Sequence, residues 1–219
     1  MNQTENRKGN DHADNHARSR PPHWAWRERF TMFLTGLVLA GVLAGTLLFL
    51  FISRSGDTST LTRLKIAGDG FLAARLDQSF ARILFATLAT NTGYLAVLFA
   101  LGFWAIAQPA ALGLLLFRGL GLGATVAQIY AQFGRRGILI AAVLVVPNAL
   151  LSVFALVLGA RESVRMSNLY ASVSLRHRTA EGIHDAAKLY AVKFLVLEAF
   201  MAASALCDCI CAVLYNRFS

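Results

Sequence analysis

The side chains that could take part in chemistry are the few charged residues inside long apolar runs. Arg118 is the only base well inside such a run, and Glu198 is the only acid away from the end of one. On insertion scales a charge at the centre of a membrane helix costs about 2.5–3.5 kcal/mol. We therefore predict that Arg118 pairs with Glu198, the alternative being that its side chain extends to the nearer membrane interface.

Around Arg118, polar residues and a glycine recur at spacings of three and four. The members of this polar stripe are Arg118, Gly121, Thr125, Gln128 and Gln132. Such spacing puts them on one helix face, which we expect to turn towards other helices rather than lipid. The preceding apolar run has a similar face formed by Thr87, Asn91 and Tyr94. We expect Asn91, together with Asn148 further along the chain, to meet the polar stripe.

These residues do not form a catalytic constellation. The apolar runs contain no histidine and no GxSxG, HExxH or GxGD motif. Glu198 and Asp208 would be about 15 Å apart along one helix, too far for a pair of catalytic acids. The GxG pattern near Arg118 follows no strand, so it is a weak signal for nucleotide binding. The prediction is a protein without enzymatic activity, cofactor or metal.

Three cysteines lie in the last apolar run, at Cys207, Cys209 and Cys211. On one helix they point in different directions, so together with Asp208 they could not close around one ion unaided. Their number and spacing also give no disulfide framework. We expect them to be small buried thiols.

The whole composition is that of a protein embedded in a membrane. Of 219 residues, 56% are apolar, and the mean hydropathy is +0.53. The net charge of +9 comes mostly from residues beside the apolar runs, which indicates contact with anionic lipid head groups rather than nucleic acid. The predicted fold class is an all-α integral membrane protein, a bundle of about five transmembrane helices with an outer amphipathic helix.

The predicted organisation is a disordered, basic cytoplasmic tail at 1–29 and a polytopic membrane domain at 30–219. The spans within that domain are predicted at 30–52, 83–107, 110–133, 137–160 and 189–215. Between the first two spans, apolar residues at helical spacing predict an amphipathic interfacial helix near 72–83. Residues 161–188 are predicted to be a basic, polar loop. Arginines cluster before the first span, which favours a cytoplasmic amino terminus and an outer carboxyl terminus in a multi-pass cell-membrane protein.

Proline and small residues mark the turns and contacts of this bundle. Pro109 predicts a tight reversal between two spans, and Pro147 predicts a kink in the fourth. In the first span Gly36, Ala40 and Ala44 line one face, and Gly41 and Gly45 form a GxxxG pair. Such faces allow helix backbones to approach closely, although small residues are also common in ordinary membrane helices.

The order of these residues resembles the stage II sporulation protein M family. The resemblance covers about 80–160 and a patch around Glu198. The residues that carry it are Asn91, Gly102, Pro109, Arg118, Gly119, Gly123, Gly137, Pro147, Asn148 and Glu198. No single element is specific, whereas the ordered set is.

The resemblance implies a non-catalytic membrane scaffold that acts during engulfment at the sporulation septum. Such a scaffold anchors and recruits membrane-anchored cell-wall hydrolases, namely an amidase/endopeptidase and a lytic transglycosylase. The loop at 53–82 and the Arg135–Arg136 connector would contact the partners' outer domains, and the Gly36, Ala40 and Ala44 face their membrane anchors. The alternative is a permease-like transporter subunit, with Arg118, Gln128, Gln132 and Glu198 along a pathway.

Overall fold

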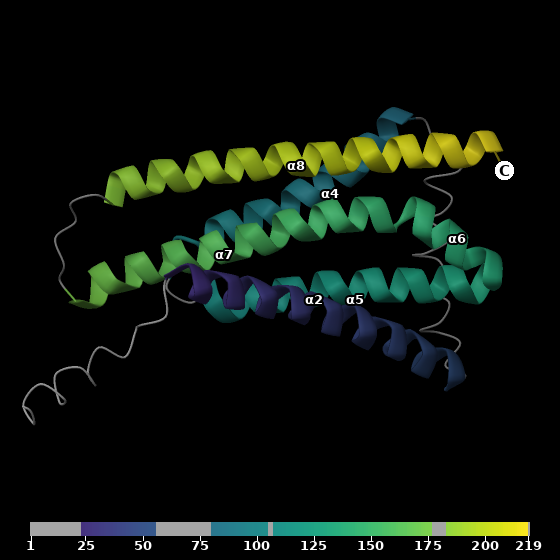
Figure 1. The fold of residues 1–219 in the computed structure, drawn as a ribbon, viewed down its shortest axis with the longest axis horizontal. Coiled ribbons are helices and arrows are strands. Elements are labelled where there is room, and N and C mark those ends of the chain that lie inside the picture. Colours follow the sequence, from purple (N-terminus) through teal and green to yellow (C-terminus); the bar gives the residue numbers. More distant parts are fainter. Residues whose placement is uncertain (1–22, 56–79, 105–106, 177–182, 219) are drawn as a thin grey trace, which may run out of the picture.

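The computed structural model describes residues 23–55, 80–104, 107–176 and 183–218, and this part of the chain is helical with short turns and no strand (Figure 1). The helices are α2 (His23–Arg54), α4 (Phe80–Leu101), α5 (Ala107–Phe133), α6 (Arg135–Leu144), α7 (Val146–Arg176) and α8 (Ile183–Phe218). The predicted all-α class is confirmed.

Four of these helices, α2, α4, α5 and α8, are long and apolar enough to cross a membrane. α6 and α7 meet at a bend of 48° and together pass the same test, which makes up to five spans. The bend falls at Val145, just before Pro147, whose ring cannot continue the helical hydrogen bonding of the preceding turn. The kink predicted at Pro147 is therefore present, and Pro109 lies in the first turn of α5, where proline is tolerated.

Several predicted boundaries are wrong. The second span was expected to reach residue 107, but α4 ends at Leu101 and Ala107 already begins α5. The amino-terminal tail was expected to reach residue 29, but α2 begins at His23. The predicted loop at 161–188 is helical as far as Arg176 and again from Ile183. Polar residues there indicate that the chain leaves the hydrocarbon, yet lysine and arginine are good helix formers, so the helices continue past the apolar runs. The tail at 1–22 and most of the predicted amphipathic helix lie outside the described residues, while Phe80 already belongs to α4.

The bundle is arranged around α7. In Figure 1, α4 and α8 lie on one side of α7, and α2 and α5 lie on the other. Small and aliphatic residues of α7 fill this centre, and Ala155, Leu156 and Ala160 are completely buried. They pack with Leu34, Leu98, Leu115 and Met201, which come from the four surrounding helices and are also completely buried. Because α7 stands between α5 and α8, it limits which polar side chains of those two helices can meet.

α2 and α5 approach each other through glycine. A Cβ atom added to Gly41 would lie 2.7 Å from the Leu116 carbonyl oxygen, and one added to Gly119 would lie 2.5 Å from that of Val38. The Gly41–Gly45 pair therefore packs against α5 of the same chain, backbone to backbone. Gly119 and Gly123, which belong to the resemblance set, supply the matching surface.

The connector between α5 and α6 turns on two glycines. Gly134 has a φ of 56°, in the left-handed region that glycine adopts at little cost. At Gly137 an added Cβ would lie 2.6 Å from the Ile129 carbonyl oxygen, because α6 folds back closely on the end of α5. The positive φ at Gly134 and the close return at Gly137 account for the two glycines that flank the Arg135–Arg136 connector.

Replacing Gly134 with alanine is expected to lower the free energy of unfolding by about 1 kcal/mol, because alanine is strained in the left-handed region. The measurement is equilibrium unfolding in detergent micelles. Gly93→Ala is the control, since nothing lies within 4 Å of a Cβ added there and its helix would gain propensity. Equal behaviour of the two variants would contradict the proposed strain.

Candidate functional site

The middle of the bundle contains a polar cluster centred on Arg118. Its Nη2 atom lies 3.4 Å from Asn91 Oδ1 and 3.4 Å from Ser152 Oγ, and its guanidinium carbon lies 5.2 Å from the centre of the Tyr94 ring. These contacts join α4, α5 and α7. Both hydrogen bonds are long, so the cluster combines several weak interactions rather than one strong pair. The predicted meeting of Asn91 with Arg118 is confirmed.

The predicted pair between Arg118 and Glu198 does not form in the described part of the chain. Instead, the Glu198 carboxylate accepts a hydrogen bond from the Thr92 hydroxyl of α4. α8 packs along α4 and α7, whereas α5 lies beyond α7 (Figure 1). Spacing along α8 predicts which residues share a face, but it does not reveal which neighbouring helix that face meets.

The face of α8 that contains Glu198 is turned into the bundle. Met201 and Ala205 are completely buried, and Asp208 is 1% exposed. Asp208 Oδ2 accepts a hydrogen bond of 2.8 Å from the Thr87 hydroxyl. Thr87, Asn91 and Tyr94 of α4 therefore all face other helices, as predicted from their spacing.

The polar stripe of α5 is only partly inward. Gln128 is buried, but Gly121 and Gln132 are exposed. The face that packs most tightly is made by Gly119 and Gly123. Gly119 directly follows Arg118, so this glycine face is rotated by about 100° from Arg118 around the helix axis. Asn148 was also predicted to meet this stripe, but its hydrogen bonds are made with α8. It is buried, and both its backbone carbonyl oxygen and its side-chain oxygen accept hydrogen bonds from the Ser204 hydroxyl.

Hydroxyl groups from α7 and α8 satisfy carbonyl oxygens around the end of α4. Ser163 Oγ donates to the Leu98 carbonyl oxygen at 2.8 Å, Ser167 Oγ to that of Trp104 at 2.6 Å, and the Tyr190 hydroxyl to that of Phe99 at 3.0 Å. The last carbonyls of a helix have no partner within it, so such bonds stabilise its end. Gly102 lies here because a Cβ atom would overlap the Tyr190 hydroxyl.

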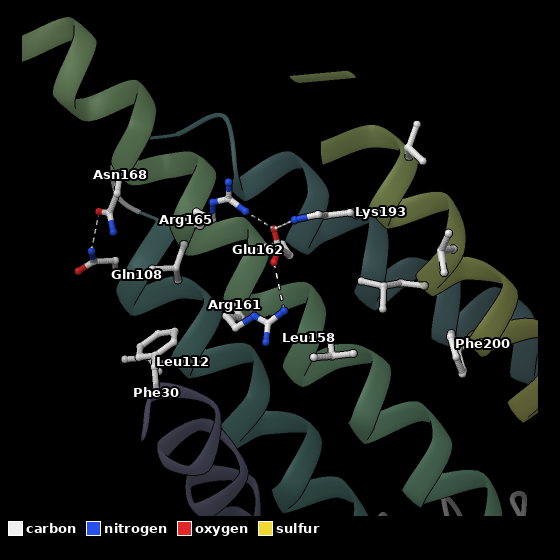
Figure 2. A pocket seen from close by; sticks show the side chains of 14 residues that line it. Phe30, Gln108, Leu112, Leu158, Arg161, Glu162, Arg165, Asn168, Lys193 and Phe200 are labelled. Atoms are coloured by element: carbon white, nitrogen blue, oxygen red, sulfur yellow. Dashed lines mark hydrogen bonds and ion pairs between the residues drawn. The ribbon is translucent and has the colours of Figure 1, made fainter. Parts of the chain in front are cut away.

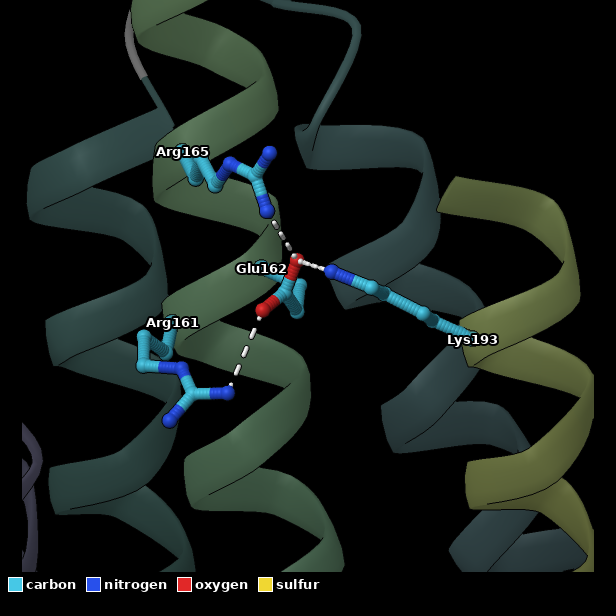
Figure 3. A network of polar contacts seen from close by, with 4 residues as sticks. All are labelled: Arg161, Glu162, Arg165 and Lys193. Carbon is cyan, nitrogen blue, oxygen red and sulfur yellow. Dashed lines mark hydrogen bonds and ion pairs between the residues drawn. The ribbon is translucent and has the colours of Figure 1, made fainter. Parts of the chain in front are cut away.

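A charged network lies on α7 and α8, near the same end of the bundle (Figure 3). The Glu162 carboxylate forms ion pairs with three cations. Its oxygen atoms lie 2.7 Å from Lys193 Nζ, 3.2 Å from Arg161 Nη2 and 3.4 Å from Arg165 Nη1. The Glu162 side chain is 11% exposed, whereas those of Lys193 and Arg165 are 33% and 67% exposed. One buried carboxylate thus organises three cations.

This network forms part of the wall of an open groove with a volume of about 1290 Å³ (Figure 2). Gln108 and Asn168, joined by a hydrogen bond of 2.8 Å, lie at one edge. Apolar side chains form much of the remaining wall, and they include Phe30, Leu112, Leu158, Val196 and Phe200. The groove therefore combines a positively charged part with an apolar part.

The sequence does not reveal this groove, because the polar residues at 161–188 predict a loop where the structure has helix. One signal was present, since Lys193 lies inside the last apolar run and had no assigned partner. Its partner Glu162 lies two residues past the end of a predicted span, and the structure brings the two together. Lys193 near the start of one span and Glu162 just past the end of another would form an ion pair if these two helix ends were neighbours.

The candidate partner contacts lie elsewhere on the molecule. Gly36, Ala40 and Ala44 are exposed on α2, and nothing lies within 4 Å of a Cβ added to Gly36. Arg135 and Arg136 are exposed at the opposite end of the bundle from the charged network. Cys209 is buried and the other two cysteines are partly buried, all as free thiols. Among the described residues, no group of three or more His, Cys, Asp or Glu side chains is placed to hold a metal ion.

Comparison of the chain with protein-family models, curated proteins and solved structures finds no match. The fold and its polar contacts define an α-helical protein with several apolar helices suited to a membrane and with polar side chains bonded to one another between the helices.

Proposed function

We propose that this protein is a membrane scaffold that binds the membrane anchors of other proteins through α2. The observation that supports this proposal is the division of α2 into two small-residue faces. Gly41 and Gly45 are packed against α5, while Gly36, Ala40 and Ala44 stay exposed on the outside of the bundle. In hydrocarbon, helix association depends on close packing, and a small-residue face permits it.

The proposed partners are membrane-anchored cell-wall hydrolases, an amidase/endopeptidase and a lytic transglycosylase, at the sporulation septum. This part of the proposal is supported by the ordered residues that resemble the stage II sporulation protein M family, including Asn91, Pro109 and Arg118. In the proposed orientation the amino terminus is cytoplasmic. Arg135 and Arg136 then face the wall-containing space, where the partners' outer domains would lie.

The second candidate function is a permease-like transporter subunit. The feature that favours it is the broken span formed by α6 and α7, because transporters build binding sites at interrupted helices. The polar contacts favour the scaffold. Arg118 and Glu198, the proposed pathway residues, are engaged by Asn91 and Thr92 and so bind neighbouring helices together.

Affinity capture of the tagged protein from sporulating cells is expected to recover at least one wall hydrolase. Ala40→Leu combined with Ala44→Leu is expected to lower that recovery about tenfold, because leucine side chains hold a partner helix at a distance. Leu39→Ala combined with Leu43→Ala is the matched control, since these leucines are exposed on the same helix and their truncation leaves the small-residue face open.

Mass spectrometry of the captured proteins measures the outcome. Recovery of an ATP-binding-cassette ATPase without any wall hydrolase would overturn the scaffold and favour the permease. Equal hydrolase recovery by the Ala40/Ala44 variant and the control would show that α2 does not hold the partners.

A further inference from the structure

The groove beside the Glu162 network has an excess of positive charge. Arg161, Arg165 and Lys193 surround the single carboxylate of Glu162, which leaves two positive charges uncompensated within this network. A carboxylate has only two oxygen atoms, whereas each arginine carries five N–H donors and lysine three. Arg165 and Lys193, both accessible, therefore retain donors for an anionic group in the groove.

The positive part of the groove lies at the level expected for lipid head groups. Phe30, Leu112 and Leu158 line the same groove beside the cations, and each lies within two residues of the predicted end of a membrane span. Lys193 is four residues inside the start of the last span. The hydropathy of four separate segments thus places the groove at one membrane interface, where anionic phospholipids present their phosphates.

The apolar part of the groove continues onto a surface suited to lipid chains. Val192 and Val196 of α8 line the groove and are 58% and 51% exposed. Phe200, 41% exposed, lies further along the same helix and contacts Phe154 of α7 with ring centres 6.2 Å apart. An acyl chain leaving the charged part can follow these residues along α8, whereas a soluble anion would leave that apolar wall uncovered.

We propose that this groove binds one anionic phospholipid from the surrounding bilayer. Its phosphate accepts hydrogen bonds from Arg165 and Lys193, and its acyl chain lies against Leu158, Val196 and Phe200. Glu162 positions the cations, since its carboxylate holds both side chains at the same side of the groove. Basic pockets between membrane helices are a recurrent form of head-group site. This binding is independent of the proposed scaffold function.

The test is native mass spectrometry of the full chain in detergent, titrated with phosphatidylglycerol or with phosphatidylcholine of the same acyl chains. Phosphatidylglycerol is expected to remain bound about tenfold more tightly than phosphatidylcholine, and Arg165→Gln combined with Lys193→Gln is expected to remove most of that preference. Arg135→Gln combined with Arg136→Gln is the control, because it removes the same charge at the other end of the bundle.

Equal retention of the two lipids, or an equal loss of preference in the control, would overturn the proposal. Displacement of phosphatidylglycerol by inorganic phosphate at low millimolar concentration would assign the groove to a soluble anion and overturn it too. A second measurement does not depend on the charge variants. In Val192→Trp, with the three native tryptophans replaced by phenylalanine, phosphatidylglycerol with brominated chains is expected to quench tryptophan fluorescence more than brominated phosphatidylcholine does. Equal quenching would count against the site.

Discussion

Replacing Gly123 with leucine is expected to separate α2 from α5 and to lower the free energy of unfolding by about 3 kcal/mol or more. A Cβ atom at this position overlaps the backbone carbonyl of Val42, and a backbone cannot move aside as a flexible side chain can. The Thr46 hydroxyl, 3.3 Å from the Gly123 carbonyl oxygen, would also lose this contact. The measurement is reversible unfolding in mixed micelles, followed by circular dichroism.

Gly121→Leu is the matched control for this effect. Gly121 lies on the same helix two residues earlier, and nothing lies within 4 Å of a Cβ added there. Its replacement is expected to leave the stability unchanged or to raise it by up to about 1 kcal/mol, because leucine favours a helix over glycine. A similar loss of stability at both positions would mean that helix α5 tolerates no leucine in general, and the close α2–α5 contact would not be the cause.

Replacing Asn91 with leucine is expected to lower the free energy of unfolding by about 2 kcal/mol. Asn91 is 1% exposed, and its side-chain oxygen accepts the hydrogen bond from Arg118. Leucine has a similar size but cannot accept that bond, so the guanidinium would keep its charge in an apolar environment with one interaction fewer. The measurement is the same unfolding experiment.

A double-mutant cycle separates this interaction from simple packing. With Arg118→Met already present, Asn91→Leu is expected to cost less than about 0.5 kcal/mol, because no cation remains to be satisfied. Thr90→Leu is the control, since Thr90 is exposed and bonds only within its own helix in the described structure. An Asn91→Leu cost that is unchanged by Arg118→Met would show that the two residues are not coupled.

Hydropathy and residue spacing predicted the main features of the fold. The apolar runs correspond to α2, α4, α5, the bent α6–α7 pair and α8. The kink before Pro147 and the inward face of Thr87, Asn91 and Tyr94 were also predicted, because both follow from rules within one helix. The same rules underestimated the lengths of α2, α7 and α8, since hydropathy marks the edge of the membrane and helices do not have to end there.

The partners of the charged residues depended on the packing of the helices. Glu198 was predicted to pair with Arg118, but Glu198 and Asp208 accept their hydrogen bonds from Thr92 and Thr87, since α4 packs along α8. Arg118 instead meets Asn91 and Ser152, because α7 stands between α5 and α8. Among the contacts that hold neighbouring helices together are the backbone contact of the α2 and α5 glycines and the serine and tyrosine bonds to the end of α4. These interactions join residues far apart in the chain, so a pattern along one helix predicts that a polar face is buried and leaves its partner to the tertiary structure.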